Sequence, residues 1–308
     1  MGLDFITIVK GQHEFDSFHP APNLIYRIVT DVTYDNNRTL KFATSPYQIT
    51  SLIGDKKVPI RNVLRLYPAI DRKMRSAEAS IDVNGAFADS SFFEISGYDL
   101  LDGEKKLALT TPASLIISKQ TSVALFGEEF SLGKKVMLDG FGQFRITGIF
   151  DAPVNSHLNY SIYASTATLD SMANVGAAFP ELDDLHVYNR CYSYIELDEP
   201  TALGNLNEAL DQISIALGTV DTDDGEKFAF KFHSENILDI IPSSRLLNTG
   251  KSISVFNLIV FLGFCLVILL LGIFNYATIT LAHSLNRAKE IAVRKVSGAT
   301  VVNIRQQI

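Results

Sequence analysis

The sequence predicts an α+β fold: a two-lobed domain, in which a mainly-β lobe is inserted into an α/β lobe, followed by one transmembrane helix. The 31 residues from Ser252 to Ala282 contain no Asp, Glu, Lys or Arg. Residues 25–88 and 191–233 each combine short strand patterns with one helical pattern, which is typical of α+β layouts. Residues 89–165, which lie between them, are dense in glycine turns and short strand patterns, and this indicates an inserted lobe. We expect the two flanking segments to pack together as one lobe and 89–165 to form a second, with no continuous sheet spanning all of these segments.

The apolar stretch is long enough to cross a bilayer. Of the 27 residues from Val255 to Leu281, 21 are apolar. As a helix they measure about 40 Å, which exceeds the ~30 Å hydrocarbon core. A buried helix of a soluble core is the alternative, but such helices rarely run past ~20 residues without a charge. We expect Gly272 and Asn275 to share the face toward other membrane helices, because a polar Asn is rarely turned to lipid.

The charges on either side of this helix predict its orientation. After Ala282, five basic residues stand against one acidic residue, a net of +4; since the whole chain carries −7, residues 1–282 carry −11. By the positive-inside rule, the basic tail is cytoplasmic and the acidic domain lies outside the cytoplasm. Residues 1–10 are too short and too polar for a signal peptide or a span, so we expect that the first membrane helix is missing from the start of this sequence. Cys191 and Cys265 fall on different segments and should not pair.

The remaining elements follow from local patterns. In chain order, we expect a strand at 25–32, a helix at 46–54, strands at 58–67, 81–88, 114–119, 135–138, 144–150 and 191–197, a helix at 200–217 and a strand at 228–233. The first helix should be capped by Ser45 and end at Gly54. The second has leucines and an isoleucine at helical spacing.

No motif predicts catalysis. Gly127–Lys135 resembles a phosphate loop, but five residues separate its glycines where four are required, and its last residue stands where Ser or Thr would hold magnesium. A turn between a helix and a strand is the better interpretation. The acids of Asp221–Glu226 lack calcium-loop spacing, and Asn155, His157 and Asn159 are interpreted as turn or cap residues. We therefore expect no catalytic, metal-binding or cofactor-binding residue, no nucleic-acid partner and no enzymatic activity.

The basic tail predicts an amphipathic helix that begins near Ser284 and ends at Gly298, after which Thr300 can cap another. An apolar stripe is formed by Leu285, Ala288, Ile291, Ala292 and Val296, and Arg287, Glu290 and Arg294 lie on another face. One interpretation places this helix on anionic lipid headgroups. The small residues of the stripe favour docking into a protein groove instead.

Residues 287–300, Arg-Ala-Lys-Glu-Ile-Ala-Val-Arg-Lys-Val-Ser-Gly-Ala-Thr, resemble the signature that follows the second membrane helix in ABC transporter permeases of the MacB/FtsX type. Asn275-Tyr276 and Leu281-Ala282 match the form common in Bacteroidota members. Further similar segments are 14–20 and 25–29, which resemble the segment leading from the first membrane helix into the periplasmic domain, and 116–119, 125–127, 132–134, 146–149 and 155–158, which resemble the inserted part of that domain. The likeness covers nearly the whole chain.

This resemblance implies a permease subunit of a mechanotransmitting ABC transporter in the inner membrane. Such a subunit couples ATP hydrolysis by a separate ATPase to motion of its periplasmic domain, in efflux or extrusion of a periplasmic substrate. The implied partners are the ATPase, which binds the ATP, the lipid bilayer, a second permease in a homodimer or pseudo-dimer and, as further candidates, a periplasmic adaptor and an outer-membrane channel. The implied segments are a stalk remnant (1–24), the first half of a porter-like lobe (25–88), the inserted lobe (89–165), the second half of the porter-like lobe with a stalk (166–250), the transmembrane helix (251–282), and a cytoplasmic coupling helix with the start of the next helix (283–308).

The resemblance also implies an interface with the ATPase in the tail. Its expected residues are Ala288, Glu290, Ile291, Ala292, Arg294 and Lys295, with the alanines and the isoleucine in an ATPase groove and the charged residues at its rim. The alternative function is a membrane-anchored extracytoplasmic sensor, in which a domain also precedes a span and a basic tail. A sensor should continue into a helix with heptads, whereas Gly298 interrupts the helix 16 residues after Ala282.

Overall fold

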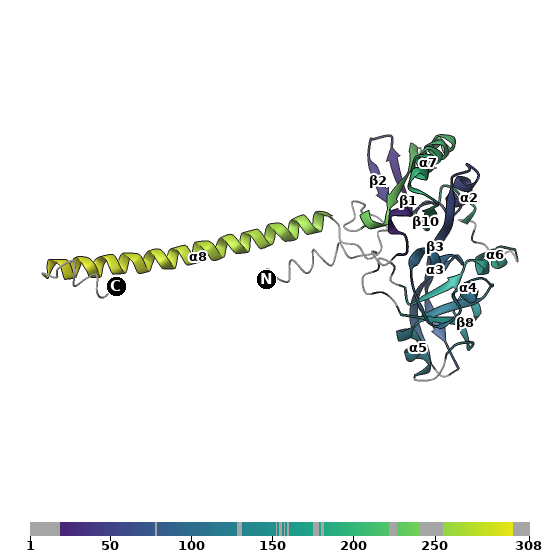
Figure 1. The fold of residues 1–308 in the computed structure, drawn as a ribbon, viewed down its shortest axis with the longest axis horizontal. Helices are drawn as coiled ribbons and strands as arrows, with labels where there is room; N and C mark the ends of the chain where they lie inside the picture. Colours follow the sequence, from purple (N-terminus) through teal and green to yellow (C-terminus); the bar gives the residue numbers. More distant parts are fainter. Residues whose placement is uncertain are drawn as a thin grey trace. The chain divides into compact units, whose positions relative to one another are not determined.

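The structure is a computed structural model, which describes residues 19–77, 79–127, 131–151, 153, 156, 158, 160–174, 179, 182–221, 227–240 and 255–297. The chain divides into two compact units, Met1–Ser254 and Val255–Ile308 (Figure 1). The first, called the globular unit below, is a mixed sheet with helices. Within its described residues, the second is a single long helix.

One sheet of 12 strands organises the described part of the globular unit. The strands are β1 (Ile25–Tyr34), β2 (Thr39–Phe42), β3 (Ile60–Arg75), β4 (Ser80–Ala88), β5 (Leu100–Gly103), β6 (Ser114–Ser118), β7 (Lys135–Leu138), β8 (Gly142–Phe150), β9 (Ile162–Ser165), β10 (Tyr192–Leu197), β11 (Thr219–Asp221) and β12 (Lys227–Asn236). Their order is β11-β12-β1-β10-β3-β4-β9-β6-β8-β5, with β2 paired to β1, and β7 to β3 and β8. The β4–β9 and β6–β8 pairs are parallel, and the other pairs are antiparallel.

The helices pack against this sheet. They are η1 (Pro22–Leu24), α2 (Ile49–Gly54), α3 (Phe92–Ser96), α4 (Lys105–Ala108), α5 (Lys119–Phe126), α6 (Ala167–Asn174), η3 (Pro200–Ala202), α7 (Leu203–Leu217) and η4 (Ile237–Asp239), and α8 (Val255–Val296) forms the second unit. Figure 1 shows α7 and α2 near β1, β2 and β10, and α4 and α5 near β8. The face of α7 that carries Leu206, Leu210 and Ile213 is buried against the sheet, in one cluster with Phe230 and Phe232 of β12. The helical spacing of these leucines and the isoleucine is thereby explained.

The predicted α+β class is confirmed, but the expectation that the two lobes would have separate sheets is wrong. β4 pairs with β3 on one side and with β9 on the other, so the sheet passes without a break from strands of 25–88 to strands of 89–165. The strand order still groups β12, β1, β10 and β3, which come from the two flanking segments. The positions of the predicted segment boundaries stay predictions.

A polar junction beside the core joins β3 to the ends of β4 and β9. Arg65 of β3 donates from Nε and Nη2 to the two carboxylate oxygens of Asp89, which follows β4, at 2.9 Å each. Thr166, directly after β9, donates to Asp89 Oδ1 at 2.7 Å. Burial by itself lowers the pKa of the Arg65 guanidinium, but the hydrogen bonds and the charge of Asp89 outweigh it and raise that pKa above its ordinary value. The junction therefore holds a fully charged pair where β3, β4 and β9 meet.

Most predicted elements lie close to their expected positions, but the first helix differs. α2 begins at Ile49, and no side chain caps it. Ser45 is buried instead, where its N–H donates to Cys191 O at 2.8 Å and its hydroxyl donates to Ser193 Oγ at 2.9 Å. The Ser45 hydroxyl therefore satisfies a buried partner on β10 rather than a helix end. Other predicted turn or cap residues, namely Asn155, His157, Asn159, Gly298 and Thr300, lie outside the described residues, as do 222–226.

Candidate functional site

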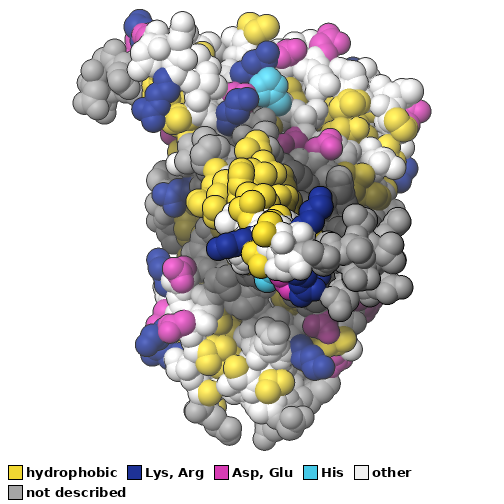
Figure 2. Space-filling view, turned by 90° about the vertical axis from the view of Figure 1, so that its left-hand side faces the viewer, with side chains coloured by type: hydrophobic (Ala, Val, Ile, Leu, Met, Phe, Trp, Pro, Cys, Tyr) yellow, Lys and Arg dark blue, Asp and Glu magenta, His cyan; other side chains and the backbone are white. Residues whose placement is uncertain are grey.

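The predicted membrane helix is confirmed as a helix, and α8 continues beyond it. α8 runs unbroken over 42 residues. Among the described residues it is the one helix long and apolar enough to cross a membrane. Its side chains from 259 to 296 are exposed except for a partly exposed Ile291. Figure 2, which faces the carboxyl-terminal end of α8, shows hydrophobic side chains gathered along the helix and Lys and Arg side chains near its end.

No break separates the apolar stretch of α8 from its basic tail at the expected boundary, residue 282. On either side of that boundary, the hydroxyls of Thr278, Thr280 and Ser284 donate to backbone carbonyls four residues earlier, at 2.8, 2.9 and 2.9 Å. Such bonds satisfy hydroxyls in surroundings without water. The predicted tail helix is thus the continuation of the predicted membrane helix.

The expected coupling residues occupy two faces at the end of α8. Ala288, Ile291 and Ala292 share one face, while Arg294 Nη2 donates to Glu290 Oε1 one turn earlier on another, as the spacing predicts. Lys295 follows Ala288 by seven residues and so lies in line with the apolar stripe rather than beside Arg294. Among the described residues, it has no ion-pair partner. Contact of this surface with an ATPase stays a prediction.

Gly272 and Asn275 are three residues apart on the same side of α8, as expected from their spacing. Both are exposed, and a Cβ added at Gly272 would meet nothing within 4 Å. The glycine therefore leaves open space on the described surface of α8. Packing of another helix against this face stays a prediction.

The second part of the candidate site is the end of the sheet at which β1 begins and β12 ends. β1 and β12 are antiparallel neighbours from Tyr26↔Asn236 to Tyr34↔Phe228. β1 is the first described strand and β12 is the last. The segments that precede β1 and follow β12 therefore connect to adjacent strands, at the same end of the sheet.

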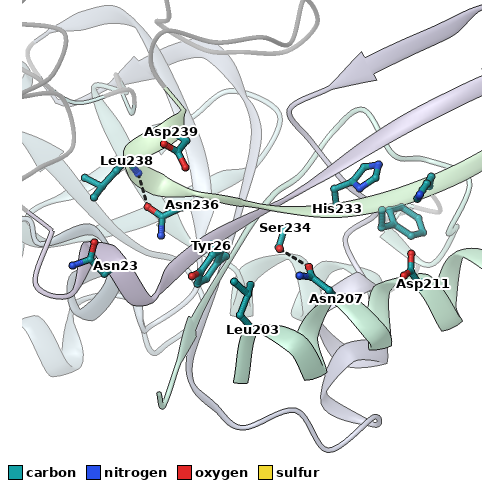
Figure 3. Close-up of a pocket in the computed structure, with 12 residues that line it drawn as sticks. Asn23, Tyr26, Leu203, Asn207, Asp211, His233, Ser234, Asn236, Leu238 and Asp239 are labelled. Carbon is teal, nitrogen blue, oxygen red and sulfur yellow. Dashed lines mark hydrogen bonds between the residues drawn. The ribbon is translucent and has the colours of Figure 1, made fainter. Parts of the chain in front are cut away.

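Side-chain contacts join β1 and β12 at the end of the sheet where β1 begins and β12 ends. Asn236 Nδ2 donates to Pro22 O at 3.1 Å, and Asn236 Oδ1 accepts from the Leu238 N–H at 3.0 Å, the second of which is dashed in Figure 3. Arg27 Nη2 lies 2.7 Å from Glu235 Oε2, with side-chain exposures of 0% and 14%. The Nε and Nη1 groups of Arg27 have no hydrogen-bond partner among the described residues. Glu235 is therefore the group that compensates the buried guanidinium charge.

An open groove lies between α7 and β12 beside these contacts (Figure 3). Ser234 Oγ donates to Asn207 Oδ1 at 2.6 Å, and the Phe232 N–H donates to Ser214 Oγ at 3.0 Å, so both bonds tie α7 to β12. His233 Nε2 lies 3.4 Å from Asp31 Oδ2 of β1. The described residues contain no group of three His, Cys, Asp or Glu side chains placed to hold a metal ion. The polar groups of the groove thus join structural elements.

Sequence reasoning did not single out Arg27, Glu235 or Asn236. The available signal was the one charge within the apolar start of β1, Ile-Tyr-Arg-Ile-Val. A charge at a buried strand position requires a partner. The identity of that partner depends on the β1–β12 register, which local patterns do not contain.

An α+β unit and, in the described part of the chain, one helix long and apolar enough to cross a membrane are the features of a membrane-anchored domain. Residues 6–213 match the family model described as the MacB-like periplasmic core domain, and the chain of 308 residues belongs to this family. It is a permease relative of the MacB/FtsX type, as the tail signature indicated. Among curated proteins, no match was found.

The chain is also similar to domains of solved structures. A domain assigned to a permease protein from Porphyromonas gingivalis has 17% identity and a TM-score of 0.56, over 71% of this chain and 92% of that one. This likeness shows a shared fold. Two further matches are the extracellular domain of the ABC-type transporter YknZ from Gram-positive bacteria (16% identity, TM-score 0.43, 67% of this chain and 99% of that one) and the periplasmic region of MacB from Actinobacillus actinomycetemcomitans (13%, 0.48, 74% and 91%).

Proposed function

We propose that this chain is a mechanotransmitting permease subunit, which carries motion between a cytoplasmic ATPase and its own periplasmic unit. The observation that carries the proposal is the continuity of α8, whose one helix joins the membrane stretch to the amphipathic tail. At 1.5 Å per residue its 42 residues measure about 63 Å, roughly twice the hydrocarbon core. A force on the tail would thus reach the far side of the membrane without crossing a flexible link.

The clamped strand pair supports the other end of this pathway. η4, the last described element of the globular unit, lies next to the Asn236 and Glu235 contacts that join β12 to η1 and β1. A pull at η4 would therefore move both strands together. Because one sheet runs through the described unit, this motion would be shared by strands of the inserted region.

Partners follow from the family. MacB-like permeases work with an ABC ATPase and form dimers, and the apolar helix is consistent with the inner membrane. For this chain we propose a basic tail in the cytoplasm, ATP bound by the ATPase and by no residue of this chain, and extrusion of a periplasmic substrate. A periplasmic adaptor and an outer-membrane channel are further proposed partners. A sensor would share the anchored domain, but the family favours the permease.

The experiment substitutes the tail in the co-expressed full-length complex. Ala292→Glu places a charge in the proposed ATPase groove and should reduce stimulated ATP hydrolysis to the basal rate, because central packed residues dominate interface energies. Lys289→Ala removes an exposed charge, worth ~0–1 kcal/mol, and should change hydrolysis little. Circular dichroism confirms that both variants fold. If Ala292→Glu leaves stimulated hydrolysis intact, the tail does not couple and the proposal fails.

A further inference from the structure

Two positive charges face each other across a strand pair in the inserted region. β7 and β8 are antiparallel with Lys135 directly opposite Arg145. The Arg145 N–H donates to Ala113 O at 2.8 Å, away from β7, so Lys135 and Arg145 form a non-hydrogen-bonded pair of the β7–β8 ladder. Side chains of such pairs are the closest across a ladder, with Cβ atoms ~4.5–5.5 Å apart, and like charges there repel. This arrangement is unfavourable unless a negative group lies between them.

The protein does not supply that negative group in the part of the chain that the structure describes. Both side chains are exposed, and neither has an ion-pair partner among the described residues. Two other surface cations of the unit do have one: Arg75 contacts Asp139 at 2.5 Å, and Lys105 contacts Asp99 at 2.5 Å. The pair on β7 and β8 lacks such a partner although its two charges lie directly opposite each other.

The pair lines a cavity of about 250 Å³ whose wall is a fixed loop. The lining residues are polar, basic or apolar, and none is Asp or Glu. Ala113 in this loop has a φ of 58°, a left-handed backbone that a non-glycine residue rarely adopts. Its N–H donates to Thr168 Oγ1 at 2.9 Å, and its carbonyl accepts the bond from Arg145. Strained backbone held in place by its neighbours is frequent at binding sites.

We propose that this cavity binds an oxyanion, the phosphate or carboxylate group of a small solute, between the Lys135 ammonium and the Arg145 guanidinium. Arg145 presents paired N–H donors that match two oxygens of such a group, and Lys135 adds a point charge. Gln143, which also lines the cavity, offers an amide N–H donor. The site is independent of coupling through α8, so its failure would leave the permease proposal untouched.

The test measures thermal unfolding of the full chain in detergent, with sodium phosphate, sodium citrate or sodium chloride at equal ionic strength. Phosphate or citrate should raise the unfolding temperature of the globular unit by about 2–5 °C above chloride. A response to phosphate alone assigns a phosphorylated ligand, a response to citrate alone assigns a carboxylate, and a response to both assigns a general oxyanion site. Absence of a shift with both anions would overturn the proposal.

Matched variants locate the effect. Lys135→Gln and Arg145→Gln should lose most of the anion shift, and in chloride they should unfold at or above the temperature of the unsubstituted chain, because the repulsion is gone. Lys106→Gln removes an exposed charge on α4 and should keep the full shift. Lys135→Arg retains the charge and should keep it too. If the two glutamine variants respond to anions as the unsubstituted chain does, the site is not at Lys135 and Arg145. Equilibrium dialysis with radiolabelled phosphate gives the same comparison at a temperature where every variant is folded.

Discussion

The globular unit buries large side chains and pairs its buried charge, whereas α8 exposes its large apolar side chains. In the globular unit a guanidinium is 0% exposed and held by a carboxylate, and aromatic side chains such as Phe87 and Phe150 are completely buried. On α8, Phe274 is 70% exposed and Leu271 is 63% exposed. Exposed apolar surface of this extent marks contact with a membrane or a partner. The globular unit therefore carries its own stability, whereas α8 depends on its surroundings.

The largest effect should follow from breaking the Arg27–Glu235 pair. Glu235→Ala leaves a buried guanidinium without its partner, and removing one member of a buried pair costs ~3–5 kcal/mol. The double variant Arg27→Met with Glu235→Met should recover most of this loss, because no charge is then buried. Urea unfolding of the globular unit measures both. Lys105→Ala is the control: Lys105 contacts Asp99 at 2.5 Å, but their side chains are 45% and 87% exposed. If Glu235→Ala costs no more than this control, the pair does not clamp β1 to β12.

A charge introduced on α8 should reduce membrane insertion rather than the folding stability of the globular unit. Leu270→Arg places a cation near the middle of the apolar stretch, where insertion scales assign about 2.5–3.5 kcal/mol against it. Leu270→Phe changes shape without charge and serves as the control. A glycosylation-based insertion assay should show reduced insertion for the arginine variant alone. Equal insertion of both variants would mean that this stretch does not face lipid or a membrane partner.

Local patterns were sufficient for most single elements and insufficient for their pairing. The strand at 81–88 was predicted because its residues have β-forming patterns, and β4 lies there. That β4 joins β9, through residues as distant in sequence as Gly85 and Ile162, could not be predicted, because parallel pairing leaves no local signal. The separate-sheet expectation was wrong for this reason. Ser45 was misassigned for the same reason, since its buried partner Ser193 lies 148 residues away.

The β4–β9 joint can be tested at Gly85. A Cβ added there would lie 2.4 Å from Ile162 Cγ1 and 2.7 Å from the Ile162 carbonyl oxygen, so Gly85→Ala forces the strands apart. We expect a loss of ~1–3 kcal/mol, typical of overpacking. At Gly204 in α7 an added Cβ meets nothing within 4 Å, and Gly204→Ala should stabilise by up to ~1 kcal/mol. Denaturant unfolding compares the two, and a neutral Gly85→Ala would mean that β4 and β9 are not tightly joined.

The smallest effect concerns Cys191, the buried cysteine of the globular unit. Burial raises the pKa of the Cys191 thiol from 9.0 to about 12, and the Ser193 hydroxyl only partly opposes this. At pH 9 the folded chain should keep Cys191 as an unreactive thiol, whereas the unfolded chain ionises it. Since the unfolded state alone releases this proton, the thiol weakens folding as pH rises above about 9. Mass spectrometry after iodoacetamide treatment at pH 9 should find Cys191 modified only in denaturant; modification in the native chain would contradict its burial.

Motion of the globular unit in response to the ATPase tests the central claim most directly. A spin label at Ile215→Cys, a position on α7 that is 79% exposed, with Cys265→Ser to remove the exposed native cysteine, reports one distance between the two permeases of the complex. Addition of ATP should shift the distance distribution in the otherwise unsubstituted complex, and Ala292→Glu should abolish that shift while the two permeases and the ATPase remain assembled. A shift that persists in Ala292→Glu, or a distribution that ATP leaves unchanged in both, would contradict transmission through the tail of α8.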